Sequence, residues 1–417
     1  MIRFFHPLHL VPALCLLVIA GCAAPPGKQL MGDPRSPYPL KVSPKVGDIV
    51  HLPTGTIVTP AQMLAVAGGA RVVYVGETHD NPASHRLELQ LLQGLEELHP
   101  GRQAIGMEMF ARSQQPILDR WVAGKLDEKA FLKESHWFDN WHMDFAYYRD
   151  LLNFARDRHI PVIALNAEKS LVAAVRAKSP DQLTPDERAK LPEMDFDDPY
   201  QRATVVAIFG DHSHGGMLLD GFVRAQTLWD ETMAESVARY LASPAGKDKH
   251  LLVVAGGYHV EYGFGVPRRA FRRLPASYLL IGGREIDIPA EKKSELMQVD
   301  LPEYPMIPYD FQAYYAYESL PESGIRLGVM IEPAQNGRGL LIQSVAPGSN
   351  AERAGLKQGD LLLSLDGEAL ADNFDLIYAV KQKHAGDHGS LRFEREGQTL
   401  TADVVFQAGG EGHPSGK

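Results

Sequence analysis

Apolar and polar residues are distributed along the first two thirds of the chain in blocks that predict strands separated by helices. Stretches with helical periodicity separate uninterrupted apolar runs at 71–75, 104–109, 161–165, 251–255 and 278–281. Apolar runs without alternation are typical of strands buried on both faces, and parallel strands need a crossover helix between them. The pattern therefore predicts an α/β domain with a mainly parallel sheet and helices on both faces.

After about residue 320 the pattern changes to short strands with turn signals between them. A helix is expected at about 373–384, and a final strand pair at 390–406. This pattern predicts a second, smaller and β-rich domain. Within the first domain, residues 180–200 are polar and interrupted by proline. We therefore expect this segment to be an excursion from the core or a lid.

The N-terminus has the features of a signal peptide. Arg3 precedes an apolar run from Leu8 to Ala20 that is too short to span a membrane, and the run ends in Ile19-Ala20-Gly21-Cys22. This tetrapeptide resembles a bacterial lipobox, which implies acylation of Cys22 and anchoring of the protein in a membrane. Because Ala23 rather than aspartate follows Cys22, the resemblance to sorted lipoproteins implies the outer membrane, with the protein facing the periplasm.

The expected organisation follows from these patterns. Residues 22–45 are rich in Pro, Gly and Ser and are expected to form a flexible tether. We expect five regions: a signal peptide at 1–21, the tether at 22–45, the α/β domain at 46–320, the β-rich domain at 323–408 and a disordered tail at 409–417.

Composition narrows the possible functions. The formal net charge of -10 gives the chain no overall attraction for nucleic acid, so no nucleic-acid partner is expected. Both cysteines lie within the first 22 residues, which leaves the folded part without a disulfide framework or a thiolate metal site.

Titratable side chains gather where the predicted strands end. Glu77 and His79 follow the strand at 71–75, Glu108 ends the run Ala104 to Met109, and His259 follows two glycines after the strand at 251–255. The carboxyl ends of parallel strands meet at one edge of a sheet, so these residues are expected to lie near one another. Arg86 lies near the start of the helix that is expected to follow His79.

This set of residues is compatible with several kinds of chemistry. Two histidines and two glutamates suit a divalent metal such as Zn, Mn or Co, and they suit general acid–base catalysis or a binding pocket equally well. The loop "GDHSHGG" adds His212 and His214, a pair that can bind a metal or supply an axial haem ligand. The candidate metal ligands are therefore Glu77, His79, Glu108, His212, His214 and His259.

Five ordered motifs carry a family resemblance over about residues 45–320. The segments "VVYVGETHDNPASH", "AIGMEMF", "IPVIALNA", "RAQTLWDETMAESV" and "LLVVAGGYHVEYGFGVPRRA" together resemble the ChaN-like haem-binding lipoproteins of the Tiki and erythromycin-esterase superfamily. The resemblance implies that the GxxH motifs ending in His79 and His259 face a common cleft, and that the protein takes part in haem or iron uptake.

The same resemblance has an enzymatic side. In the hydrolases of the superfamily, the catalytic positions match Glu77, His79, Arg86, Glu108 and His259 of this chain. The spacing between Glu77 and His79 is shorter than the corresponding spacing in the esterases.

Haem needs an axial ligand, an apolar slot and cations for its propionates. The candidate haem-binding residues are His79, Tyr258, His259 and Tyr262 as ligands, with Arg268 and Arg269 for the propionates. A solvated helix face is the alternative interpretation of the basic segment "RRAFRR" that contains the two arginines.

The C-terminal region has its own resemblance. The segment "AERAGLKQGDLLLSLDGEAL" resembles the PDZ domains of HtrA-type periplasmic proteases, and Arg326, Leu327, Gly328 and Val329 match the PDZ loop that binds a peptide carboxylate. Arg326 replaces the usual hydrophobic first residue of that loop. No GxSxG or GDSGG motif of a serine protease accompanies this domain, so it is expected to recruit a partner.

The leading interpretation is a lipid-anchored binding protein that captures haem or an iron chelate and docks a protein C-terminus through the PDZ domain. A metal-assisted hydrolase of the Tiki kind is the alternative, and an envelope scaffold with a vestigial site is the third. A homodimer that holds haem between two copies is a further expectation about partners.

Overall fold

The computed structural model describes residues 38–209, 216–294, 299–320, 324–334 and 337–408. The predicted signal peptide, the lipidation site Cys22, the pair His212 and His214 and the predicted tail lie outside the described residues. Within the described residues, no helix combines the length and the apolar character that a membrane span requires.

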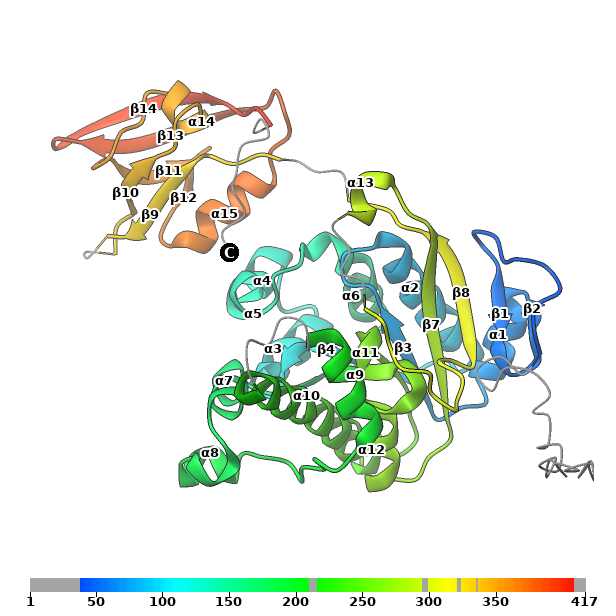
Figure 1. Cartoon of the computed structure of the whole chain (residues 1–417). Coiled ribbons are helices and arrows are strands. Elements are labelled where there is room, and N and C mark those ends of the chain that lie inside the picture. The colour runs from blue at the N-terminus through cyan, green and yellow to red at the C-terminus, as the bar shows by residue number, and fades with distance from the viewer. Residues whose placement is uncertain (1–37, 210–215, 295–298, 321–323, 335–336, 409–417) are drawn as a thin grey trace, which may run out of the picture.

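An eight-stranded sheet organises the larger domain, in the order β2-β1-β8-β7-β3-β6-β4-β5 (Figure 1). Its strands are β1 Ile49–His51, β2 Thr56–Val58, β3 Val72–Glu77, β4 Gln103–Ala111, β5 Val162–Asn166, β6 His250–Gly256, β7 Tyr278–Asp287 and β8 Phe311–Ala316. The strands from β8 to β5 pair in parallel, whereas β1 pairs antiparallel with both β8 and β2. The mainly parallel sheet is confirmed, with an antiparallel extension at one edge.

Helices cover both faces of this sheet, because the side chains of its strands point alternately to two separate apolar cores. Val73 and Val75 of β3 join a core built with helices α2, α3 and α6, whereas Val72 and Tyr74 join a core with α10 and α12. The helices are α1 Pro60–Ala67, α2 Pro82–Leu98, α3 Gln115–Val122, α4 Glu128–Glu134, α5 Trp137–Asn140, α6 Arg149–Asp157, α7 Lys169–Ala177, α8 Pro185–Ala189, α9 Pro199–Phe209, α10 Gly216–Ala242, α11 Gly257–Val260, α12 Val266–Arg273 and α13 Ala290–Lys293.

The C-terminal domain is a separate antiparallel sheet in the order β14-β13-β11-β10-β9, with β12 paired to β11. Its elements are β9 Val329–Pro333, β10 Leu340–Val345, α14 Asn350–Arg353, β11 Leu361–Leu365, β12 Glu368–Ala369, α15 Asn373–Lys381, β13 His388–Arg395 and β14 Gln398–Val405. The domain has its own apolar core, so the predicted small β-rich domain is confirmed. Strand β9 lies at an edge of the sheet and pairs only with β10 among the described strands.

The two domains touch through α15, which faces α4 and α5 of the larger domain (Figure 1). The ring of Phe374 stacks on that of Phe138 with 5.6 Å between centroids. Lys133 forms ion pairs with Asp372 and Asp375 at 3.0 and 2.9 Å. This apolar stack with ion pairs at its border positions the C-terminal domain beside the helices that lead to the predicted site.

Candidate functional site

Three neighbouring strands end at the same edge of the sheet and position the predicted site. Strands β3, β6 and β4 lie side by side, with Glu77 of β3 level with Gly256 of β6, and Glu108 near the end of β4. Short α11 follows Gly256 directly and carries His259. After His79 the chain turns into α2, where the side chain of Asn81 accepts a hydrogen bond from the backbone N–H of Ala83.

Gly256 is the point where these groups meet. Its backbone N–H donates to Glu108 Oε2 at 2.7 Å. A Cβ on Gly256 would lie 2.9 Å from His79 Nε2 and 3.6 Å from Glu108 Oε2. The absence of a side chain at Gly256 therefore lets the His79 ring lie against the end of β6.

His79 is held by Glu77 through Nδ1, and its Nε2 can bind a ligand once it has lost its proton. Its Nδ1 lies 2.5 Å from Glu77 Oε1, and its ring meets that of Trp141 edge-on at 5.0 Å. Burial lowers the pKa of His79, but the hydrogen bond and charge of Glu77 outweigh burial and raise that pKa to about 9. Burial, followed by the charge of Glu88, raises the pKa of Glu77 to about 7.

His259 lies between two carboxylates. Its Nε2 is 3.3 Å from Glu108 Oε1, and its Nδ1 is 2.6 Å from Asp230 Oδ1. Burial lowers the pKa of His259, but Glu108 and Asp230 raise it well above its ordinary value, and His259 in turn holds the pKa of Glu108 at about 2 against the effect of burial. Both nitrogens of the imidazolium donate, and Nε2 would offer a lone pair only after losing its proton, with Nδ1–H held by Asp230.

Tyr258 and Tyr262 line a small cavity, open to solvent, next to α11. Tyr258 is 41% exposed, so part of the residue is accessible to a ligand. Phe264 walls the cavity and stacks on Tyr262 and Tyr200 at 5.5 and 4.9 Å. Burial, with the charge of Glu261, raises the pKa of Tyr258, so its phenol is neutral near pH 7.

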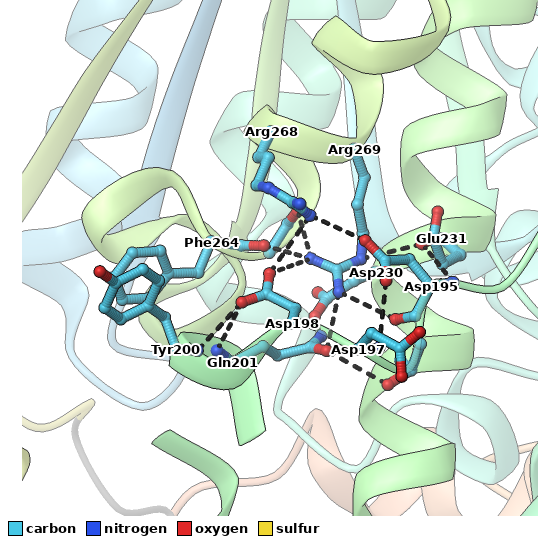
Figure 2. A network of polar contacts seen from close by, with 12 residues as sticks. Asp195, Asp197, Asp198, Tyr200, Gln201, Asp230, Glu231, Phe264, Arg268 and Arg269 are labelled. Atoms are coloured by element: carbon cyan, nitrogen blue, oxygen red, sulfur yellow. Dashed lines mark hydrogen bonds and ion pairs between the residues drawn. The ribbon is translucent and has the colours of Figure 1, made fainter. Parts of the chain in front are cut away.

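The basic segment on α12 is largely neutralised by acidic residues, as Figure 2 shows. Arg269 is fully buried, with Glu231 Oε1 at 3.2 Å, Asp198 Oδ2 at 3.4 Å and a hydrogen bond to Gln201. The Arg269 side chain therefore cannot reach a propionate, and its role is to fix α12 to the segment before α9. Its acidic partners lie distant in sequence, so the pattern "RRAFRR" alone could not reveal them.

Arg268 on the same helix is half-exposed. Its Nη1 lies 3.0 Å from Asp195 Oδ2 and 3.3 Å from Asp198 Oδ2. Arg268 remains accessible to a ligand, although its charge already has acidic partners.

Arg86 does not join the other predicted catalytic residues. Its guanidinium makes two hydrogen bonds to the carboxylate of Glu318, at 2.7 and 2.5 Å, and its side chain is 53% exposed. The prediction of a catalytic arginine is therefore not supported by this arrangement, because the long side chain reaches a partner that only the fold brings near.

Glu77 at the end of β3 also belongs to a buried group of ligand side chains that the sequence analysis missed. Side-chain ligand atoms of Glu77, His85 and Glu88 lie within 4.8 Å of one another. The spacing His85-x-x-Glu88 places both residues on one face of a helix, a signal that the sequence contains.

The PDZ loop has the form that carboxylate binding requires. Gly328 has φ +82°, and the carbonyl groups of Leu327 and Gly328 accept hydrogen bonds from the N–H groups of Ala351 and Ala346. The N–H groups of Leu327 and Gly328 have no hydrogen-bond acceptor among the described residues. Two free amides at the start of the edge strand β9 can therefore receive a peptide carboxylate.

Family comparisons match each of the two domains separately. Residues 63–270 match the family described as "Haem-binding uptake, Tiki superfamily, ChaN", and residues 326–405 match the PDZ domain family. A probable periplasmic serine endoprotease DegP-like protein of Marinomonas sp. is 35% identical over 92 residues, which are 20% of each chain. DegP of Salmonella typhimurium is 34% identical over 70 residues, 17% of this chain and 15% of the relative. The chain thus spans about a fifth or less of these relatives.

Solved structures resemble each domain. One is ChaN of Campylobacter jejuni, described with cofacial haem binding, at 17% identity and a TM-score of 0.46 over 66% of this chain and 98% of that one. The HtrA3 PDZ domain bound to a phage-derived ligand matches at 22% identity and a TM-score of 0.18, over 20% of this chain and 85% of that one.

Proposed function

The chain joins a ChaN-type domain of the Tiki superfamily to a PDZ domain, and we propose that it binds haem and docks the C-terminus of a protein partner. The observation that carries the haem proposal is the partly exposed Tyr258 at the rim of an aromatic-walled cavity in the domain that matches the haem-binding family.

The residues at the cavity fit haem in kind. Bound haem supplies an iron that takes an axial ligand and two propionates that need cations. Tyr258 offers an oxygen ligand and the Phe264 wall offers an apolar surface. Arg268 on α12 does not line the cavity but is a half-exposed cation. The cavity has room for little more than a water molecule, so a flat macrocycle would lie across its rim and keep at least one face uncovered.

Among the other predicted ligands, the geometry favours His79 over His259. His79 Nδ1 is bonded to Glu77, which leaves Nε2 as the nitrogen that can face a ligand, and the side chain is 32% exposed. His259 is less accessible than His79, because it is 8% exposed and both of its ring nitrogens face carboxylates. A metal-assisted hydrolase receives less support, because His259 is already paired with two carboxylates and Arg86 is bonded to Glu318.

The PDZ domain supports docking of a peptide carboxylate by strand addition. Strand β9 is an edge strand, the amides of the preceding loop are free among the described residues, and Ile377 of α15 is 40% exposed. Helix α15 would flank the added peptide, as in PDZ recognition generally.

The proposal includes a location. The sequence Ile19 to Cys22 supports acylation of Cys22, and the Pro-rich tether that follows supports a lipid-anchored protein that faces the periplasm from the outer membrane. In that place, haem capture and docking to another envelope protein would serve iron uptake.

Haemin titration of the full-length chain tests the haem proposal. We expect a shifted Soret band that Tyr258→Phe weakens, because the variant loses only the ligand oxygen. Tyr278→Phe is the matched control, since Tyr278 is 40% exposed but does not line the cavity. If no haem form shifts the spectrum, or if the two variants behave alike, the proposal fails.

A further inference from the structure

A buried cluster of three ligand side chains lies between β3 and α2. Glu77 ends β3, and His85 and Glu88 are one turn apart on α2. The exposed fractions of Glu77, His85 and Glu88 are 5%, 5% and 0%. None of the three lines the cavity at Tyr258, although Glu77 also holds His79 of the candidate site.

The hydrogen bonds of His85 determine which ring nitrogen faces the cluster. His85 Nε2 lies 3.0 Å from the backbone carbonyl oxygen of His79. A carbonyl only accepts, so Nε2 carries the proton, and the lone pair of the neutral ring is on Nδ1. Nδ1 lies 3.2 Å from Glu88 Oε2 and 3.7 Å from Glu77 Oε2. Metal-binding histidines are commonly oriented in this way by a carbonyl on their second nitrogen.

The carboxylates present oxygens that no protein donor satisfies. Glu77 Oε1 accepts from the Tyr148 hydroxyl at 2.8 Å and contacts His79 Nδ1. Glu77 Oε2 and Glu88 Oε1 are buried and have no hydrogen-bond partner among the described residues. Burial raises the pKa of Glu88 to about 8, so either a proton shared between Glu88 and Glu77 or a bound cation would compensate these buried oxygens.

We propose that Glu77, His85 and Glu88 bind one divalent first-row cation, such as Zn²⁺. The two carboxylates supply two negative charges that balance the ion, and one imidazole with two carboxylates is a donor set that Zn²⁺ accepts. With metal–ligand bonds of about 2.0–2.1 Å, tetrahedral ligands are roughly 3.3–3.4 Å apart. The separations of 3.2 and 3.7 Å from His85 Nδ1 lie on either side of that spacing.

This ion would also position the adjacent site residue. Glu77 Oε2 would bind the metal while Oε1 keeps its bonds to Tyr148 and His79. The cation would thereby fix the orientation of Glu77 and, through it, of His79. Because the group is closed to solvent, we expect metal to enter during folding or slow opening.

The test is metal loading of the full-length chain. The protein is unfolded in denaturant that contains a chelator and is then refolded either without metal or with Zn²⁺. The zinc bound to each sample is measured by mass spectrometry. We expect about one Zn²⁺ per chain and a higher melting temperature in the loaded protein. Glu88→Gln keeps the shape of the side chain and should abolish this zinc. The matched control Glu261→Gln, which alters another largely buried carboxylate, should retain it.

A milder variant and a spectrum guard against misfolding as an explanation. Tyr148→Phe removes only the hydroxyl that supports Glu77 and should weaken zinc binding about 10–100-fold. X-ray absorption at the zinc edge should show nitrogen and oxygen ligands with one imidazole. Failure of the wild-type chain to bind zinc, or equal binding by Glu88→Gln, would overturn the proposal and leave a proton-sharing cluster. His79→Gln should keep the zinc, so the haem proposal can fail independently.

Discussion

Replacing Gly256 with alanine perturbs one contact at the centre of the candidate site. The new Cβ would lie 2.9 Å from His79 Nε2 and 3.0 Å from His79 Cε1, closer than side-chain atoms normally approach. The backbone of Gly256, at φ -53° and ψ 146°, accommodates alanine without strain. The substitution therefore acts on the His79 ring and leaves the backbone in place.

The size of the effect follows from what His79 must give up. The ring can swing toward solvent, because 32% of its side chain is already exposed, but this movement breaks the 2.5 Å contact with Glu77. A hydrogen bond to a charged group contributes about 1.5–3 kcal/mol, and partial exposure reduces that value, so we expect a loss of about 1–2 kcal/mol. Without Glu77, the pKa of His79 should fall from about 9 toward its ordinary value.

Gly257→Ala provides the matched control. A Cβ on Gly257 meets only the Tyr309 hydroxyl oxygen at 3.5 Å and the carbonyl oxygen of Glu77 at 3.8 Å, which are ordinary contacts. Both substitutions restrict the unfolded chain in the same way, so the difference between the two variants isolates the contact with His79. Urea unfolding gives the free energies, and an NMR titration of the His79 ring gives its pKa. An unchanged pKa of His79 in Gly256→Ala, with stability equal to that of Gly257→Ala, would refute the reasoning.

Three further predictions follow from single features of the structure. Arg269→Met leaves the buried carboxylate of Asp198 with less charge compensation and should lower the free energy of unfolding in urea by about 3–5 kcal/mol. Gly328→Ala places a Cβ 2.3 Å from Ser349 Cβ at φ +82°, and should weaken binding of a C-terminal peptide at least about tenfold in fluorescence anisotropy, whereas an amidated peptide should bind poorly to either protein. The pKa of His79 is raised from 6.5 to about 9 on folding, so its stabilising contribution is complete below pH 6.5 and is lost as the pH rises through 9. Urea midpoints should fall over that range, and a rise would contradict the assignment.

Local sequence patterns determined much of the architecture. Uninterrupted apolar runs identified the central strands, because a strand covered on both faces needs apolar side chains in both directions. The change near residue 320 to short strands with turn signals located the second domain, because such strands are typical of a small antiparallel sheet. The GxxH motifs were informative because a strand places the residue at its carboxyl end at the edge of the sheet. In this way Glu77 lies level with Gly256, and Glu108 lies beside His259.

The partners of charged side chains were decided only by the tertiary structure. Arg269 is neutralised by Asp198 and Glu231, which are distant in sequence, and Arg86 bonds Glu318 at the end of the sheet domain. These pairings form because the fold brings together segments that are distant in the sequence. A short window of sequence therefore contains no signal for them. The availability of a side chain for function follows from such partners.

The same distinction applies to the histidines. The sequence by itself placed His79 and His259 at one sheet edge as equivalent ligands, and the fold made them different. His259 is enclosed by Asp230 of α10 and Glu108, whereas His79 is held through one nitrogen by Glu77 and lies against the ring of Trp141. Strand periodicity is a local property that the sequence specifies directly, but the proton and metal affinity of a side chain depends on every charge that packing brings within a few ångströms.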